Sequence, residues 1–218
     1  MPTEARVRRA PAGDGLLILG LVGRAGSGKS TVARVLQAEG ATLIEADRVG
    51  HEVTDQDPEV RVALTAEYGA DIYGADGALD RRRVAARVFS DLDARARLDA
   101  LVHPRILSRI RGRLDVLRAG GFRGVVVIDA ALMLEWGLER DCDGVIAVVA
   151  PEVEQISRLA RARGWSEAEA RARFAAQRTN EAFARAADVT LENRGRIEDL
   201  ERVARAAVAE LRGRRATD

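Results

Sequence analysis

The chain has 218 residues, of which 47% are apolar and 32% are charged, and its formal net charge at pH 7 is +1. These values are typical of a globular protein with one core domain and smaller insertions. They exclude binding to nucleic acid or to an anionic membrane through bulk charge, because 34 acidic residues are interleaved with the basic ones. The single cysteine, Cys142, excludes an internal disulfide and is typical of a reducing compartment, so we expect a cytoplasmic protein.

The first 15 residues are basic and are not followed by a cleavage-type site, so we interpret residues 1–15 as a disordered N-terminal tail. Apolar runs rich in β-branched residues follow, and they predict buried parallel strands separated by helical patterns. This alternation predicts an α/β fold with helices on both faces of one sheet, and no run is long enough for a membrane helix. The strand-like runs are residues 16–22, 41–47, 124–133, 144–150 and 189–193.

Two intervals are too long to be simple connections between strands. Residues 48–120 contain helical patterns and little strand signal, and residues 151–187 predict two or three helices. Ser166 and Glu169 have the spacing of a capping box, which marks a helix start in the second interval. We therefore expect two helical insertions in the α/β core.

Gly23 to Ser30 match the pattern G-x-x-x-x-G-K-[ST], directly after a predicted strand and at the start of a predicted helix. Glycines and a helix N-terminus together form a cradle of N–H groups that suits the phosphates of a nucleoside triphosphate. Lys29 is the one lysine among 35 basic residues. A compact ammonium reaches the β- and γ-phosphates where a planar guanidinium would clash, and the Ser30 hydroxyl is expected to bind Mg²⁺.

Residues outside this motif indicate which class of phosphate-loop protein the chain belongs to. A switch GTPase is disfavoured because its guanine-reading motif needs a second lysine. A kinase needs a carboxylate near the acceptor hydroxyl, and strand alternation would place Glu45 and Asp47 on one face at the ligand-binding edge of the sheet. Asp47 is either the base of an acceptor site or the N-cap of the next helix.

Together these segments resemble the dephospho-CoA kinase family over residues 16–211. The likeness rests on GRAGSGKSTVA, LIEADRVGHEV, ADGALDRRRVAARVFSD, LDALVHPRI, IDAALMLEWG, PEVEQISRL and QRTNEAFARAADVTLENRG. It implies a phosphate-loop kinase of the nucleoside-monophosphate-kinase-like type, with a parallel five-stranded sheet of order 2-3-1-4-5. The implied reaction transfers the ATP γ-phosphate to the ribose 3′-hydroxyl of dephospho-CoA with Mg²⁺, the last step of coenzyme A synthesis. The implied regions are a core of residues 16–47, 121–150 and 188–218, an acceptor region of residues 48–120 and a lid of residues 151–187.

The resemblance also assigns individual residues, each with a plainer alternative. Arg81 matches an arginine that meets acceptor phosphate, or it is a solvated helix arginine. His103, before Pro104, touches the acceptor, or the pair is a packed histidine and a helix-starting proline. Asp129 holds the water shell of the magnesium ion, or it is a turn or helix cap. Asn193 and Gly195 border the adenine, or they form an ordinary turn after a strand.

The lid departs from the family pattern, which has arginines three and seven residues after the position of Gln155. Arg158 fills the first position, but Ala162 stands at the second. Arg163 is the favoured replacement over Arg161, because the adjoining Gly164 can end the helix and re-aim the side chain toward the transferring phosphoryl group.

The sequence therefore predicts a complete set of site residues and partners. The catalytic residues are Asp47, Lys29, Arg158 and Arg163; the ATP-binding residues are Gly23, Arg24, Ala25, Gly26, Ser27, Gly28, Lys29, Ser30, Thr31, Asn193 and Gly195; the acceptor-binding residues are Asp47, Arg81 and His103; and the metal ligands are Ser30 and Asp129. The expected partners are the small molecules ATP and dephospho-CoA with Mg²⁺, without nucleic acid or membrane, in a monomer or a weak homo-oligomer. The alternatives are a related kinase with another acceptor, or a non-catalytic nucleotide-binding relative.

Overall fold

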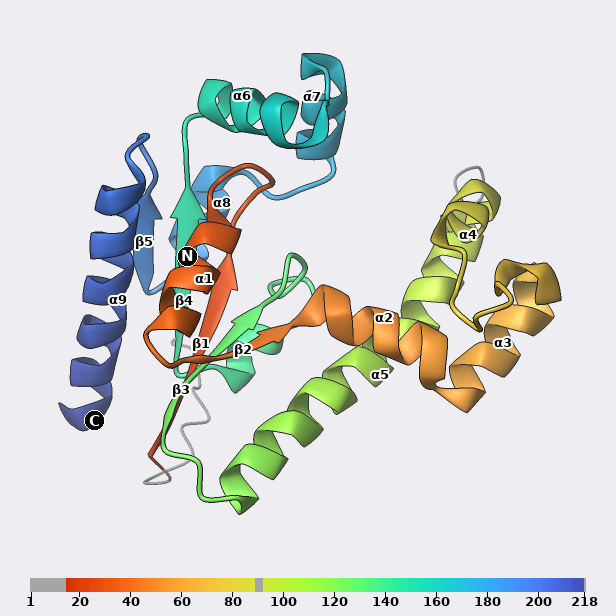
Figure 1. The fold of residues 1–218 in the computed structure, drawn as a ribbon, viewed down its shortest axis with the longest axis horizontal. Coiled ribbons are helices and arrows are strands. Elements are labelled where there is room, and N and C mark those ends of the chain that lie inside the picture. Colours follow the sequence, from red (N-terminus) through yellow and green to blue (C-terminus); the bar gives the residue numbers. More distant parts are fainter. Residues whose placement is uncertain (1–14, 89–91, 218) are drawn as a thin grey trace, which may run out of the picture. The chain divides into compact units, whose positions relative to one another are not determined.

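The computed structural model describes residues 15–88 and 92–217 (Figure 1). The predicted disordered tail, residues 1–15, lies outside the described residues except for Gly15. The chain divides into two compact units, which are described separately. The core unit contains residues 1–44 and 120–218, and the helical unit contains residues 45–119.

The core unit is built on a five-stranded sheet whose strands follow the order β2-β3-β1-β4-β5, as predicted. β1 (Leu16–Val22) pairs in parallel with β3 (Gly124–Asp129) and β4 (Gly144–Val149), and β4 pairs in parallel with β5 (Val189–Glu192). β2 (Thr42–Glu45) lies at the other end of the sheet. Every residue of β1 is buried, which explains why this strand is a continuous apolar run without alternation.

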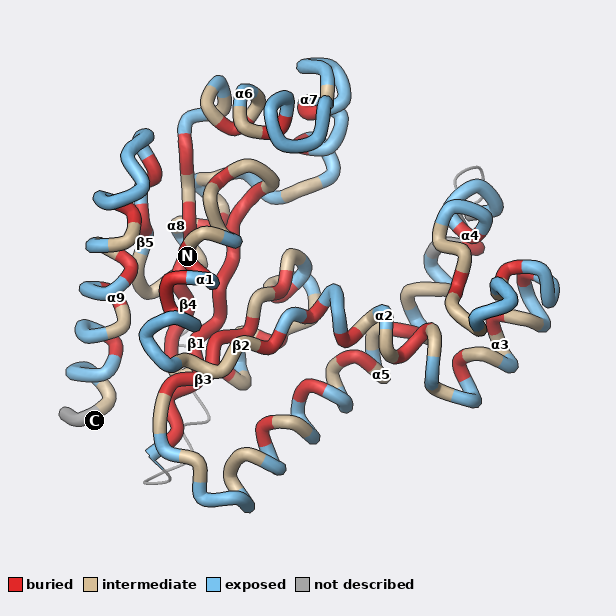
Figure 2. The backbone as a smooth tube through the Cα atoms, viewed as in Figure 1, coloured by how far each residue is buried: buried red, intermediate tan, exposed pale blue. Residues whose placement is uncertain are grey.

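Helices cover the sheet on both faces (Figure 1). α1 (Lys29–Ala38) and α9 (Ile197–Thr217) pack together on one face, and α8 (Asn180–Ala186) packs against β4 behind it. The core between α1, α9 and the sheet contains alternate residues of the strands, among them Leu19, Leu21 and Val127, each at most 1% exposed. In Figure 2 the central strands β1, β3 and β4 are buried along most of their length, while α9 alternates between buried and exposed positions.

The interval after β4 forms three helices, which agrees with the predicted two or three. α6 (Glu152–Arg163) ends at Gly164, whose φ of 68° is the left-handed conformation that favours glycine at a helix C-terminus. α7 (Glu167–Ala175) begins with the predicted capping box, because the Ser166 side chain accepts from Glu169 N and Glu169 accepts from Ser166 N. Leu159, Ala170 and Phe174 form a small apolar core between α6 and α7.

The amino edge of the sheet, where the strands begin, is held by buried carboxylates. Asp143 Oδ2 accepts from Ile18 N at 2.7 Å and from Arg215 of α9 at 3.2 Å, and Asp188 Oδ2 accepts from Val145 N at 2.8 Å. The short 3₁₀ helix η2 (Leu138–Asp141) precedes this corner. Each carboxylate therefore satisfies a strand N–H that neighbouring strands leave unpaired.

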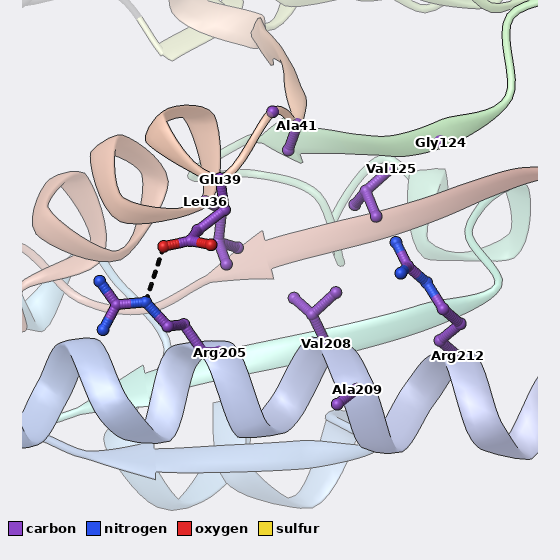
Figure 3. Close-up of a pocket in the computed structure, with 10 residues that line it drawn as sticks. Leu36, Glu39, Ala41, Gly124, Val125, Arg205, Val208, Ala209 and Arg212 are labelled. Carbon is purple, nitrogen blue, oxygen red and sulfur yellow. Dashed lines mark hydrogen bonds and ion pairs between the residues drawn. The ribbon is translucent and has the colours of Figure 1, made fainter.

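A pocket of about 340 Å³ opens at the same edge, between the end of α1, the start of β3 and α9 (Figure 3). Its floor is apolar, and Glu39 at its rim pairs with Arg205 at 2.8 Å. Leu36, Gly40, Ala41, Gly124, Val125, Val208, Ala209 and Arg212 complete its lining.

The helical unit contains four α-helices in its described part. α2 (Ala46–Gln56), α3 (Pro58–Tyr68) and the 3₁₀ helix η1 (Ala70–Ile72) precede α4 (Arg81–Val88) and the long α5 (Leu92–Ala119). α2 packs along α5 (Figure 1), and both contribute fully or almost fully buried apolar residues. None of the helices described in either unit is long and apolar enough to cross a membrane.

Candidate active site

The phosphate loop joins β1 to α1 and has the backbone that its glycines predict. Gly23, Gly26 and Gly28 have φ values of 150°, 75° and 104°, a region that residues with a side chain rarely adopt. Gly28 is the N-cap of α1, and no side chain caps the helix there. The first N–H groups of a helix have no partner within the helix, so this loop can offer them to an anion.

Lys29 and Asp129 form an ion pair at the carboxyl edge of the sheet. The Lys29 Nζ atom contacts Asp129 Oδ1, and the two side chains are 20% and 15% exposed. Asp129 ends β3, and β3 is the direct neighbour of β1, from which the phosphate loop emerges. The side chain of Asp129 thus meets the ammonium group. Its role as a metal ligand stays a prediction.

Arg158 and Asn193 both contact the phosphate loop. Arg158 donates to the carbonyl oxygens of Gly26 at 3.2 Å and Ser27 at 3.3 Å, and to Asn193 Oδ1 at 3.2 Å. The buried Asn193 donates from Nδ2 to Ser27 O at 2.8 Å. One lid arginine and one residue after β5 therefore meet at the loop, and their contacts with ATP phosphates and adenine stay predictions. Gly195, two residues later, has a φ of 129°.

The two arginines beside Ala162 lie elsewhere. The guanidinium carbon of Arg163 is 5.2 Å from the centre of the Trp165 ring, and Arg173 of α7 lies 5.8 Å from the same ring. Arg161 donates to Ser157 O of its own helix at 3.4 Å. Gly164 does end α6 as predicted, but Arg163 then stacks on Trp165. Its approach to ATP phosphates stays a prediction.

Three residues that sequence analysis did not single out complete the surroundings of the loop. Gln177 Oε1 accepts from Ala25 N at 3.2 Å, and Phe174 lies under the Arg24 guanidinium, 4.2 Å from its ring centre to Cζ. Gln155 is fully buried, and its backbone oxygen lies so close to Gly26 that a Cβ on Gly26 would approach it to 2.7 Å. Gln155 and Gln177 lie in segments that carry the resemblance. Sequence analysis did not identify the three residues, because amide and phenyl side chains have no titratable or nucleophilic group that would mark them as site residues.

In the helical unit, Asp47 is the second residue of α2, and β2 ends at Glu45. The expectation that residues 41–47 form one strand with Glu45 and Asp47 on one face is therefore wrong. The N-cap of α2 is Glu45, so the helix-cap alternative for Asp47 is also wrong. Asp47 is exposed, and within the described part of the chain its carboxylate has no hydrogen bond or ion pair. It is available as a base, and that role stays a prediction.

The other two acceptor-side residues are engaged within the helical unit. Arg81 donates to both carboxylate oxygens of Asp55 at 3.2 Å and to Thr54 Oγ1 at 3.1 Å, while its side chain stays 39% exposed. His103 Nε2 lies 3.3 Å from Asp99 Oδ1, one turn earlier on α5. Pro104 lies inside α5 and does not start a helix, which corrects that alternative. Contact of either residue with an acceptor stays a prediction.

Comparison with known proteins decides the family. Residues 17–199 match the family model described as dephospho-CoA kinase. The chain belongs to the dephospho-CoA kinase family. Among curated relatives, the dephospho-CoA kinase of Streptomyces avermitilis is 40% identical over 187 residues, covering 86% of this chain and 90% of that protein. A Corynebacterium glutamicum dephospho-CoA kinase is 36% identical over 196 residues, covering 90% of this chain and all of the relative.

Solved structures agree on the fold of this dephospho-CoA kinase family member. The crystal structure of TT1252 from Thermus thermophilus has a TM-score of 0.75 and 35% identity, covering 89% of this chain and 97% of that chain. Dephospho-CoA kinase from Campylobacter jejuni has a TM-score of 0.64 at 19% identity, covering 90% and 97%. A shikimate kinase from Acinetobacter baumannii has a TM-score of 0.51 at 15% identity, covering 92% and 96%, which shows a similar fold.

Proposed function

We propose that this enzyme transfers the γ-phosphoryl group of ATP to the ribose 3′-hydroxyl of dephospho-CoA, giving coenzyme A and ADP. The observation that carries the proposal is the match of residues 17–199 to the family, with the one lysine of the chain in the phosphate loop and paired to Asp129. A non-catalytic relative would have no need to keep this lysine where all other basic residues are arginine.

The nucleotide side of the proposal rests on Lys29, Arg158 and the loop backbone. The N–H groups at the start of α1 hold the phosphates, and Lys29 leaves Asp129 to reach the β- and γ-phosphates as a compact charge. Arg158 already contacts the loop at Gly26 and Ser27, so only a small movement of its side chain would bring a positive charge to the transferring group. Asn193 and Gly195 border the adenine. Transfer is then accelerated mainly by positioning and by charge stabilisation.

On the acceptor side, Asp47 accepts the proton of the 3′-hydroxyl as its oxygen attacks phosphorus, while ADP leaves with the bridging oxygen. The exposed and unpaired carboxylate supports this role, because a base must be free to receive a proton. Arg81 and His103 bind the acceptor. For Arg81 this requires that acceptor phosphate share or replace the contact with Asp55.

Mg²⁺ is the proposed cofactor, and Ser30 and Asp129 are the residues that would hold it. An exposed hydroxyl and a carboxylate are the hard oxygen donors that Mg²⁺ prefers, and they suffice when phosphate oxygens and water fill the other positions. The described residues include no group of three or more His, Cys, Asp or Glu that could hold a metal. When bound, the ion neutralises phosphate charge. We further propose a cytoplasmic monomer or weak homo-oligomer that binds neither nucleic acid nor membrane.

An ADP-release assay with ATP and three acceptor classes tests the proposal: dephospho-CoA, pantetheine derivatives and nucleoside monophosphates. We expect dephospho-CoA to be preferred by at least about 100-fold in kcat/KM, with the product phosphorylated at the 3′ position by phosphorus NMR. A preference for a nucleoside monophosphate would indicate a related kinase with another acceptor. No turnover with any acceptor would indicate a nucleotide-binding relative without activity.

Asp47→Asn in the same assay tests the base. We expect turnover to fall by about 10²- to 10⁴-fold with little change in ATP affinity or melting temperature. Glu45→Gln is the matched control, since it removes an exposed carboxylate two residues earlier, and it should have a much smaller effect. A melting temperature lowered by many degrees in Asp47→Asn, with activity per folded molecule preserved, would assign Asp47 a structural role instead.

A further inference from the structure

Arg24, the second residue of the phosphate loop, does not point its side chain into the phosphate cradle. Its guanidinium stacks on Phe174 of α7 at 4.2 Å, and its Nη1 atom donates to Glu152 of α6 at 3.5 Å. The residue is only 9% exposed. All of these contacts are with the lid helices, although the residue itself belongs to the loop that binds phosphate.

The stability of the fold alone does not explain this placement. An arginine is always charged, and burying its guanidinium costs stability unless good partners surround it. Among the described residues the one carboxylate in close contact, Glu152, is 39% exposed and 3.5 Å away, and Arg24 Nε is buried without a hydrogen-bond partner there. Glu181 adds a longer-range attraction. The phosphate cradle uses backbone N–H groups, so it requires no long side chain at this position.

The neighbouring loop residues are joined to the same helices. Ala25 packs against the apolar core of Leu159, Ala170 and Phe174, and its N–H group donates to Gln177 after α7. Gly26 and Ser27 accept from Arg158 of α6. Four consecutive loop residues thus contact the lid, and Arg24 supplies the one cation–π contact among them.

We propose that Arg24 is a positioning residue: its side chain docks α6 and α7 on the phosphate loop, and this docking sets the affinity of the loop for ATP phosphates. Without the guanidinium, the α6–α7 pair loses its stacking and ion-pair contacts with Arg24, while the contacts of residues 25–27 remain. Gln177 and Arg158 then bond to the loop less often, and the loop backbone spends more time in conformations that do not bind phosphate. The effect on ATP rests on the proposed function, whereas the docking itself does not.

The first test needs no nucleotide. Hydrogen exchange of the Ala25 amide, measured by NMR on the full chain, reports its bond to Gln177 directly. Arg24→Ala should speed this exchange by about tenfold, the loss expected for a largely buried cation–π contact, and Arg24→Lys should give an intermediate rate because it keeps the charge. Unchanged exchange in Arg24→Ala would overturn the docking role. This result is independent of which acceptor the enzyme uses.

The second test is kinetic. Arg24→Ala should raise KM for ATP by about 5- to 10-fold and change kcat by less than about threefold, because the residue positions the loop and does not touch the reacting atoms. Arg171→Ala is the matched control: Arg171 binds the same Glu152 carboxylate at 2.7 Å, but it is exposed and lies on α7 away from the loop contacts. KM for ATP should stay within about twofold in this control. An equal rise in Arg171→Ala would show that general lid charge, and not docking by Arg24, is responsible.

A double-mutant cycle with Phe174→Leu completes the test. Leucine keeps an apolar side chain in the α6–α7 core and removes the ring face, so Phe174→Leu should raise KM for ATP by a similar factor. The double variant should be no worse than the poorer single variant, since both changes remove the same contact. Additive effects would show that Arg24 acts without Phe174, which contradicts the proposed docking.

Discussion

The two edges of the sheet in the core unit differ in whether their polar side chains have hydrogen-bond partners. At the amino edge, Asp143 and Asp188 accept hydrogen bonds from strand N–H groups at 2.7 and 2.8 Å. At the carboxyl edge, Ser27 Oγ, Gln155 Nε2 and Asn180 Oδ1 are buried without a hydrogen-bond partner among the described residues. Ser27 and Gln155 are nevertheless fully buried.

This difference distinguishes polar groups that stabilise the fold from polar groups that are available to bind a ligand. A buried polar group without a partner costs about 1–3 kcal/mol, so it persists where another requirement outweighs stability. Parallel sheets bind ligands at the carboxyl edge, which is where this chain keeps its phosphate loop and these three groups, although Glu139 Oε2 of η2 also lacks a hydrogen-bond partner among the described residues. Substitutions at the amino edge should therefore change stability and leave turnover intact, whereas those at the carboxyl edge should do the reverse.

The largest expected effect is at the carboxyl edge, in Lys29→Arg. We expect turnover to fall by at least about 10²-fold, because the guanidinium cannot occupy the position of a compact ammonium between the phosphates. The melting temperature should hardly change, since arginine can still pair with Asp129. Steady-state kinetics and thermal unfolding measure the two quantities. Near-normal turnover would contradict our explanation for why the chain has one lysine and otherwise only arginines.

At the amino edge, Asp143→Ala should lower the free energy of unfolding by about 2–4 kcal/mol. It removes the acceptor for Ile18 N and the carboxylate that pairs with Arg215, and the side chain of Asp143 is only 5% exposed. Turnover per folded molecule should stay within about twofold, because Lys29 and the phosphate loop lie at the opposite edge. Urea unfolding gives the first quantity. A loss of turnover without a loss of stability would contradict the division between the edges.

A smaller effect at the carboxyl edge is expected for the lid. Arg163→Ala should lower turnover by about tenfold or more and change ATP binding less, if Arg163 leaves Trp165 to reach the phosphates in the ternary complex. Arg161→Ala is the comparison variant with the same charge change on the same helix. A loss confined to Arg161→Ala would reverse the assignment, and full turnover in the double variant would show that no neighbour replaces the arginine missing at Ala162.

The smallest expected effect is at the capping box of α7, which lies outside both edges. Ser166→Ala should speed hydrogen exchange in the first turn of α7 by about fivefold. The hydrogen bonds from Ser166 hold the pKa of Glu169 below its ordinary value of 4.5. The contribution of Glu169 is therefore present above that pH and is lost as pH falls through the lowered pKa. Exchange in wild-type α7 should speed up over this range, and exchange in Ser166→Ala should respond less, because the variant loses the hydroxyl bond to Glu169 and keeps the stronger bond from the backbone N–H.

The strands and the phosphate loop follow from sequence because the physics behind them is local. Buried β-branched runs form strands, and glycines with a helix start form the cradle, so β1 has the predicted bounds. Pro104 shows the limit of local rules. Proline favours a helix start, but α5 continues through it where the helix packs against α2, and tertiary contacts outweigh the missing hydrogen bond.

The candidate site shows the same limit. Motif spacing identifies Lys29 as a loop residue, and the resemblance points to Arg158 in the lid and Asn193 after the last strand, but neither says where a side chain points. Arg24 belongs to the motif and yet contacts the lid, since a partner 150 residues later, Phe174, determines its direction. The helical position of Asp47 was missed because an alternating pattern cannot reveal that a strand ends two residues early.

The pairing of Lys29 with Asp129 also has a consequence for chemical labelling. Lys29 is the only side-chain amine in 218 residues, so apart from the α-amino group an amine-selective acylating reagent can modify only this residue of the phosphate loop. The salt bridge and partial burial of the amine should slow that reaction, and nucleotide phosphates should slow it further. One modified residue, counted by intact-mass spectrometry, would therefore report occupancy of the active site without any engineered probe.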